Sequence, residues 1–460
     1  MKVIVRFQTR LALLMLLIVT ALVAQNSNRP KLAPSYKSII KPNIILIVSD
    51  DAGYKDFGSY GAKDIPTPNI NSIAAKGVKF TDAYVTASVC APSRAGLLTG
   101  RYQQRFGFEF NMTGKPTEGY LKTDMGMDPQ ERTIANEMQA NGYKTIALGK
   151  WHQGFEEKHY PLKRGFDEFY GFVGGNRNFF SNPNSKVGGQ TLMDNNTPVP
   201  EKEITYLTDM LTNKATSFIK QNKEQPFFMY LAYNAVPVPM QAKKEMMDRF
   251  ASIPNSGRRT YAAMMASLDE GVGKVLATLK ENKLDNNTIV IFLNDNGGPK
   301  VNSSDNGPLH GNKGSVWEGG IRVAFMMKWP GNIPENTVYK NPVSALDILP
   351  TSLAASVGKR EGNKKLDGVN LLPYLNKKTA SLPHDILFWR RGEGHAVRAG
   401  KWKLIKVKAE PILLFDLDKD ISETTNLANK YPDVVKNLLS KLNAWEKELS
   451  APHWTETVED

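Results

Sequence analysis

Cysteine is the residue that this sequence of 460 residues most nearly lacks, since Cys90 is the only one. A single cysteine excludes an intramolecular disulfide. An unpaired cysteine in an exported protein is a candidate for a reactive group. The count alone is equally consistent with a buried side chain that has no chemical role.

Long apolar runs are also scarce. The longest, residues 11–23, has 13 residues, whereas a membrane-spanning helix needs about 20. It follows three basic residues and precedes Ala24, which is typical of a secretory signal peptide. We therefore expect residues 1–24 to be removed during export to the periplasm or the medium, with an uncleaved anchor as the alternative. Residues 25–41, which are polar and contain proline, are expected to be a linker.

Runs of basic residues are missing, although the formal net charge is +13. The lysines and arginines are dispersed, unlike those of a nucleic-acid-binding arm. We expect an anionic polymer as partner, no nucleic acid, and no stable membrane insertion after signal cleavage. A basic surface that is merely well solvated is the alternative.

Internal repeats and low-complexity tracts are absent, and the chain instead alternates two patterns. Continuous apolar runs rich in β-branched residues are typical of strands buried on both faces. They occupy residues 43–49, 143–148, 227–233 and 288–293. Helical patterns lie at residues 69–76, 133–141, 205–223 and 261–282. This alternation predicts an α/β fold with helices on both faces of the sheet.

The pattern changes near residue 380. Short strand patterns separated by tight turns occupy residues 386–390, 395–398, 402–407 and 412–416, and a helical pattern follows at 432–449. They predict a small antiparallel sheet with a helix packed on it. We therefore divide the mature chain into a large domain, residues 42–380, and a C-terminal α+β subdomain, residues 381–460.

Three of the four strand patterns end in acidic, amide or basic residues. The residues are Asp50 and Asp51, Lys150 and His152, and Asp295 and Asn296. Ligands bind beyond the carboxyl ends of parallel strands, so we expect these side chains to share one cleft. Four of them, Asp50, Asp51, Asp295 and Asn296, offer the oxygen ligands that suit Ca²⁺ or Mg²⁺ rather than zinc. A single aspartate after a strand is more often a turn former.

Three cations accompany this cluster: Arg94, Lys150 and Lys313. Arg94 lies in a helical pattern that begins near Ser93, and the N–H groups and dipole of such a helix start favour an anion. A metal ion, several cations and a helix N-terminus together suit sulfate or phosphate transfer. Either lysine alone is more often a solvated surface residue.

Residues 90–101, Cys-Ala-Pro-Ser-Arg-Ala-Gly-Leu-Leu-Thr-Gly-Arg, resemble the signature of the type I, formylglycine-dependent sulfatases of the alkaline phosphatase superfamily. Other similar stretches are Asp50–Asp51 with Gly53, residues 149–152, 161–171, 295–297, 313–322, 396–404 and 414–427. The resemblance covers nearly the whole mature chain. It implies a large mixed, mostly parallel sheet sandwiched by helices.

The resemblance also implies a covalent mechanism. A formylglycine-generating maturation enzyme would convert Cys90 to 3-oxoalanine, and the hydrated form would join the four oxygen ligands around Ca²⁺. One diol oxygen would attack sulfur, and His152 would take a proton from the other to expel sulfate. Arg94 would steady the diol, while Lys150 and Lys313 would bind the sulfate oxygens.

Two positions depart from the family pattern. Similar sulfatases carry a histidine in an Asn-Ala-Pro-His-x-Pro stretch, where this sequence has Pro237, and another in the loop that here reads Asn176-Arg177-Asn178. Proline cannot protonate a departing sugar alkoxide, an aid worth roughly 10²–10⁴-fold. We hypothesise that His310 is the general acid, assisted by Lys313. A packing or substrate-contacting role for His310 is the alternative.

The expected function is that of an exported sulfatase acting on a sulfated glycan. Residues 103–109 resemble polysaccharide sulfatases of marine-type bacteria, which favours a galactan such as carrageenan. Arg177, Arg390, Arg391 and His395 are candidates for binding the sugar and its neighbouring sulfates. Two alternatives remain: a phosphodiester or phosphonate hydrolase that uses the same modified cysteine, and a non-catalytic protein that binds sulfated glycan.

Overall fold

The structure is a computed structural model that describes residues 41–182 and 190–456. The expected signal peptide and residues 25–40 of the expected linker lie outside these ranges. Among the described residues, no helix is both long and apolar enough to cross a membrane.

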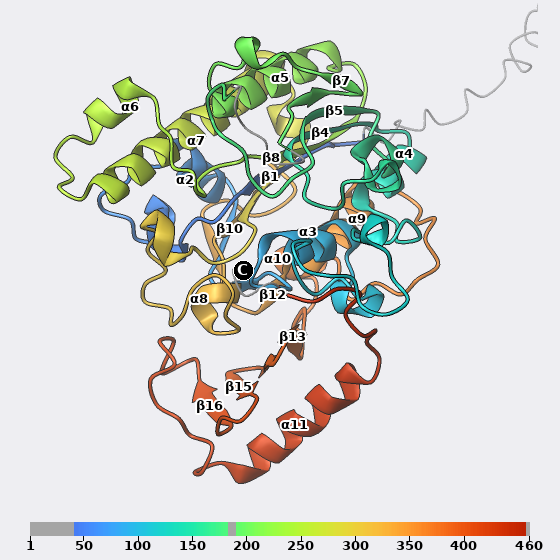
Figure 1. The fold of residues 1–460 in the computed structure, drawn as a ribbon, viewed down its shortest axis with the longest axis vertical. Coiled ribbons are helices and arrows are strands. Elements are labelled where there is room, and N and C mark those ends of the chain that lie inside the picture. The colour runs from blue at the N-terminus through green and yellow to red at the C-terminus, as the bar shows by residue number, and fades with distance from the viewer. Residues whose placement is uncertain (1–40, 183–189, 457–460) are drawn as a thin grey trace, which may run out of the picture. The chain divides into compact units, whose positions relative to one another are not determined.

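A ten-stranded sheet forms the centre of the large domain (Figure 1). Five strands run parallel at its middle, in the spatial order β9 (Thr288–Asn294), β1 (Asn43–Ser49), β8 (Phe227–Ala232), β4 (Lys144–Lys150) and β5 (Glu168–Phe172). β1, β8 and β9 are buried along their whole length, as their continuous apolar sequences predict.

The outer strands make the sheet mixed. β10 (Phe325–Lys328) is antiparallel to β9, and β2 (Val78–Phe80) and β11 (Thr337–Tyr339) continue that edge. The short strands β6 (Met193–Asp194) and β7 (Thr197–Pro198) complete the other edge. A separate pair joins β3 (Ala83–Tyr84) to β12 (Val343–Ser344). The predicted large, mostly parallel sheet is confirmed.

Helices cover both faces because successive residues of a strand point in opposite directions. Ile44, Leu46 and Val48 of β1 belong to one core cluster, whereas Ile45 and Ile47 belong to the other. The first core includes residues of α3 (Cys90–Thr99), α4 (Ile134–Ala140), α9 (Ile348–Ala355) and α10 (Leu372–Leu375). The second includes residues of α2 (Pro68–Ala75), α5 (Leu207–Gln221), α6 (Lys244–Arg249) and α7 (Ser256–Glu281).

Two helices begin three or more residues earlier than the sequence predicts. α7 begins at Ser256 rather than 261, because the Asn255 side chain caps it by accepting from the Arg258 N–H at 2.8 Å. α3 begins at Cys90 rather than near Ser93. Pro92 is tolerated in its first turn, where an amide N–H has no intrahelical partner.

The C-terminal segment forms the predicted antiparallel sheet. Its strands are β13 (Leu387–Arg391), β14 (Gly394–Ala399), β15 (Trp402–Val407) and β16 (Leu413–Asp416), in that order. One face packs on α11 (Pro432–Glu446). The other packs on Tyr84 and on residues around α8 (Glu318–Ile321) in the large domain. The boundary at residue 380 stays a prediction.

Candidate active site

A pocket of about 290 Å³ lies beyond the carboxyl ends of β1 and β4, at the start of α3. Its lining includes residues that the sequence predicts for the site and others that the sequence does not predict. The lining residues are Asp51, Cys90, Asn111, Met112, Thr113, Lys150, His152, Phe155, Gly175, Asn176, Pro237, Val238 and Lys313. Two of the three polar strand ends, those of β1 and β4, therefore reach the pocket, whereas Asp295 and Asn296 after β9 are not among its lining residues.

Cys90 is the first residue of α3 and is buried. Its Sγ lies 3.7 Å from Asp50 Oδ1 and 3.8 Å from Asp51 Oδ1. Burial raises the pKa of the Cys90 thiol to about 12, against the opposing effect of Lys150 and Lys313. The unmodified thiol is therefore protonated at neutral pH and is a poor nucleophile, since the thiolate is the reactive form.

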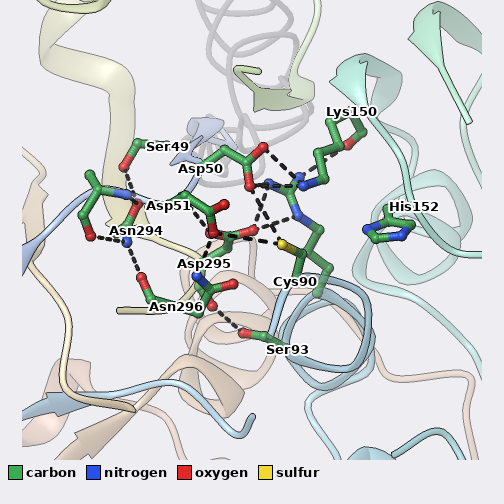
Figure 2. A network of polar contacts seen from close by, with 12 residues as sticks. Ser49, Asp50, Asp51, Cys90, Ser93, Lys150, His152, Asn294, Asp295 and Asn296 are labelled. Atoms are coloured by element: carbon green, nitrogen blue, oxygen red, sulfur yellow. Dashed lines mark hydrogen bonds and ion pairs between the residues drawn. The ribbon is translucent and has the colours of Figure 1, made fainter. Parts of the chain in front are cut away.

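Oxygen atoms from two strand ends gather beside Cys90, as Figure 2 shows. Ligand atoms of Asp50, Cys90 and Asp295 all lie within 4.8 Å of one another. Asn296 donates to Asp51 Oδ1 at 2.7 Å, and Asn296 Oδ1 is buried without a hydrogen-bond partner. A buried amide oxygen without a donor, beside three carboxylates, fits a hard cation such as Ca²⁺.

Each carboxylate of this group is also paired with a cation. Lys150 Nζ lies 2.8 Å from Asp50 Oδ1, and Lys313 Nζ lies 2.8 Å from Asp51 Oδ2. Arg94 contacts Asp295 Oδ2 at 3.0 Å through Nε. Burial opposes the charges of both lysines, but the aspartates raise their pKa values above the usual range. Both lysines are therefore cationic at neutral pH.

Arg94 is a further buried contact of the carboxylate cluster. It is buried, and besides Asp295 it donates to the Lys150 carbonyl at 3.1 Å and to the Tyr230 hydroxyl at 3.3 Å. It does not line the pocket. Its position suits steadying residue 90 and the carboxylates, whereas Lys150 and Lys313 face the space where a substrate would lie.

His152 lies beside Cys90, on the side away from the carboxylates (Figure 2). Burial, together with the positive charge of Lys150, lowers the pKa of His152 well below its usual value. Its Nδ1 is buried without a hydrogen-bond partner. A neutral imidazole with a free ring nitrogen can accept a proton.

Two residues that hold this arrangement were missed in the sequence. Asn111 Oδ1 accepts from the Ala91 N–H at 3.1 Å and so satisfies a free donor at the start of α3. Gly175 packs against His152, because a Cβ at position 175 would lie 2.8 Å from Nε2. Asn111 lies in an irregular segment 20 residues from Ala91, and no periodic pattern signals such a contact.

Comparison with known proteins decides the family. The sulfatase profile matches residues 42–358, and the profile "N-sulphoglucosamine sulphohydrolase, C-terminal" matches residues 310–448. This chain belongs to the sulfatase family. It is therefore a sulfuric ester hydrolase, and among the three functions considered from the sequence the family membership supports the sulfatase.

Curated relatives include vertebrate sulfatases. Arylsulfatase J of Mus musculus is 31% identical over 93% of this chain and 79% of its own length. N-acetylgalactosamine-6-sulfatase of Homo sapiens is 32% identical over 76% of this chain and 69% of its own length.

Solved structures are also similar to this sulfatase. The crystal structure of Ps i-CgsB in complex with k-i-k-neocarrahexaose has 39% identity and a TM-score of 0.84, covering 91% of this chain and 96% of that one. Phosphonate monoester hydrolase of Agrobacterium radiobacter, at 20% identity, has a TM-score of 0.64 and covers 89% and 96% of the two chains. The second likeness concerns the fold alone.

His310 is not brought into the pocket of the sulfatase. Its side chain is exposed, and its ring stacks on Trp317 with centroids 4.1 Å apart. Pro237 does line the pocket, so the position where relatives carry a histidine presents a carbon ring here. The predicted acid role of His310 has no support from this placement.

The four residues that are candidates for substrate binding lie outside the pocket lining. Arg177 is buried and bonded to Glu201 at 3.1 Å and to the Gln190 carbonyl at 2.8 Å. Arg391 donates to the Gly314 carbonyl at 2.9 Å, beside Lys313, and pairs with Glu456. His395 pairs with Glu446, and Arg390 pairs with Glu109. Their guanidinium and imidazole groups are committed to structural contacts, and a role in substrate binding stays a prediction.

Proposed function

We propose that this sulfatase releases sulfate from a sulfated galactan such as a carrageenan, through a formylglycine made from Cys90. One observation carries the proposal. Cys90 Sγ lies within 3.8 Å of two carboxylates at the start of α3, yet its thiol has a pKa of about 12. A thiol is a poor ligand for a hard cation among carboxylates, which favours conversion of Cys90 to a side chain that carries oxygen. The similarity to Ps i-CgsB, solved with k-i-k-neocarrahexaose, supports the galactan.

The residues of the site support this chemistry. Formylglycine at position 90 would supply a hydrated aldehyde as the oxygen nucleophile. Asp50, Asp51, Asp295, Asn296 and residue 90 would hold a Ca²⁺ ion, which would supply positive charge for the sulfate oxygens. Lys150 and Lys313 keep their charge and lie on the pocket wall, where they can bind the sulfate group.

His152 is placed to move a proton. Its ring is neutral at neutral pH because the pKa is lowered, and its Nδ1 makes no hydrogen bond. It accepts the proton that the hydroxyl at position 90 must lose when sulfate departs. Arg94 holds the Asp295 carboxylate and fixes the cluster around position 90.

The proposal includes export and maturation. Residues 1–24 act as a signal peptide, and the enzyme works in the periplasm or outside the cell. A formylglycine-generating enzyme of the host would convert Cys90 to 3-oxoalanine.

A substrate panel tests the proposal. Matured enzyme is assayed with carrageenan oligosaccharides, glycosaminoglycan oligosaccharides, an aryl sulfate and a phosphonate monoester. We expect the highest kcat/KM for a carrageenan oligosaccharide. A preference for glycosaminoglycans would overturn the galactan, and a preference for the phosphonate would overturn sulfate release as the main activity.

A further inference from the structure

A groove of about 790 Å³ lies on the sulfatase outside the active-site pocket. Its walls are residues 450–456 near the C-terminus and part of the segment 110–120. Phe110, Tyr120, Pro452 and Trp454 contribute apolar surface, and Thr117 and Glu118 contribute polar groups. No step of the proposed mechanism uses this groove.

The groove and the pocket share a wall. Phe110 lines the groove, and the next three residues, 111–113, line the pocket. Trp454 fixes this wall by donating from Nε1 to the carbonyls of Phe110 at 3.0 Å and Asn111 at 3.1 Å. A molecule that extends out of the pocket across residues 110–113 therefore reaches the groove.

Arg391 also contacts residues beside both the pocket and the groove. Its guanidinium donates to the carbonyl of Gly314, which follows the pocket residue Lys313, and pairs with Glu456 on the groove wall. One arginine and one chain segment thus separate the pocket from the groove. A ligand long enough to cross this segment can contact both.

Tyr120 gives the groove an aromatic surface. Its side chain is 40% exposed, and its ring stacks on His453 with centroids 3.9 Å apart. The hydroxyl bonds His453 Nε2 at 2.7 Å, which fixes the ring. A pre-positioned aromatic ring can pack against the C–H face of a sugar without a large loss of side-chain freedom.

The acidic residues at the groove determine which part of a glycan can bind there. Glu118 is exposed, and Glu456 is paired with Arg391. Carboxylates repel a sulfate ester but accept hydrogen bonds from sugar hydroxyls. The groove therefore suits a sugar ring that presents hydroxyls and C–H groups, whereas the cationic pocket suits the ester.

We propose that this groove binds a further sugar unit of the same glycan chain whose sulfate ester occupies the active-site pocket. The inference rests on the proposed function, since it takes a sulfated glycan as the substrate. Tyr120 is then a specificity-determining residue that favours longer oligosaccharides, and it takes no part in the chemical step.

The test compares kcat/KM across carrageenan oligosaccharides of increasing length, with an aryl sulfate as the shortest substrate. Tyr120→Ala is expected to raise KM and lower kcat/KM by about 3- to 10-fold for long oligosaccharides, which is the worth of one aromatic contact. The aryl sulfate is unaffected because it does not reach the groove. Tyr120→Phe keeps the ring and most of the advantage of long substrates.

Leu121→Ala is the matched control. Leu121 is the next residue, is 67% exposed, and does not line the groove. This variant behaves like the parent, and thermal melting checks that each variant is folded. Equal losses of kcat/KM on all substrates, or no loss on long oligosaccharides, would contradict sugar binding in the groove. Hydrolysis of the aryl sulfate without turnover of any glycan would instead overturn the proposed function, and the groove with it.

Discussion

Cys90, the proposed precursor of the nucleophile, is surrounded by groups with opposite charges. Three carboxylates and three cations lie around one buried thiol, and every carboxylate has a cationic partner. Such a network is stable only while it is complete, because removing one member leaves a buried charge unpaired. Substitutions here therefore change the metal affinity as well as the turnover.

A substitution of Asn296 tests the metal site through thermal stability, which does not depend on enzyme activity. Its buried Oδ1 lacks a hydrogen-bond donor, so we expect it to bind Ca²⁺. Millimolar Ca²⁺ should raise the Tm of the parent, because a ligand that binds only the native state stabilises it. Asn296→Leu should abolish most of this shift. An equal Ca²⁺-dependent shift in the variant would show that Asn296 is not a ligand.

His310 tests which residue protonates the leaving group. A general acid would make His310→Ala lose roughly 10²–10⁴-fold on a sugar sulfate and much less on an aryl sulfate. The ring is exposed and stacked on Trp317, outside the pocket lining. We therefore expect the ratio of the two activities to stay within about twofold of the parent. A selective loss on the sugar sulfate would restore His310 as the acid.

Contacts between elements hold the C-terminal sheet on the large domain. Lys403 of β15 is fully buried and lies 2.9 Å from Glu318 in α8 and 2.7 Å from Glu423. Lys403→Met leaves two carboxylates without their shared cation, which costs about 3–5 kcal/mol of unfolding free energy.

An exposed ion pair provides the control for Lys403. The side chains of Lys408 and Glu393 are 71% and 64% exposed. Lys408→Met should change the unfolding free energy by less than about 1 kcal/mol. Similar effects of the two variants in urea unfolding would contradict the importance of the buried cluster.

A histidine before β13 gives this connection a pH dependence. His384 Nε2 lies 2.8 Å from Asp347 Oδ1, next to α9. Burial opposes the charge, but Asp347 outweighs it and raises the pKa of His384. A raised pKa in the native state adds stability below the unfolded-state pKa, which is lost as the pH rises through the native value.

The pH dependence is measured against a variant that cannot titrate. The stability difference between the parent and His384→Gln should be largest near pH 6 and smaller near pH 9. A difference that is constant or grows with pH would contradict a charged His384.

At the scale of the whole molecule, the sequence predicts the sheet better than the site. The central strands are recognisable because both of their faces are buried, so their sequences are continuously apolar. The strand ends then place Asp50, Lys150 and Asp295 together. The helix starts are less accurate, because caps from Asn255 and Asn111 depend on geometry rather than periodicity.

The arginines show what a sequence leaves undetermined. Arg177 and Arg391 are suitable for binding sulfate by residue type, yet Glu201 and Glu456 pair with them in the folded chain. Which arginine has a carboxylate partner depends on contacts 24 and 65 residues apart. The same limit applies to Tyr120 and His453, whose stacking is visible only in the folded chain.

The central claim is that the working nucleophile is made from Cys90. It is tested by preparing the enzyme with different amounts of the maturation enzyme. Peptide mass spectrometry gives the fraction of residue 90 converted, and sulfate release from a carrageenan oligosaccharide gives the activity. We predict that activity is proportional to the converted fraction and vanishes with it. Activity that is independent of conversion, or that persists in Cys90→Ala, would contradict the account.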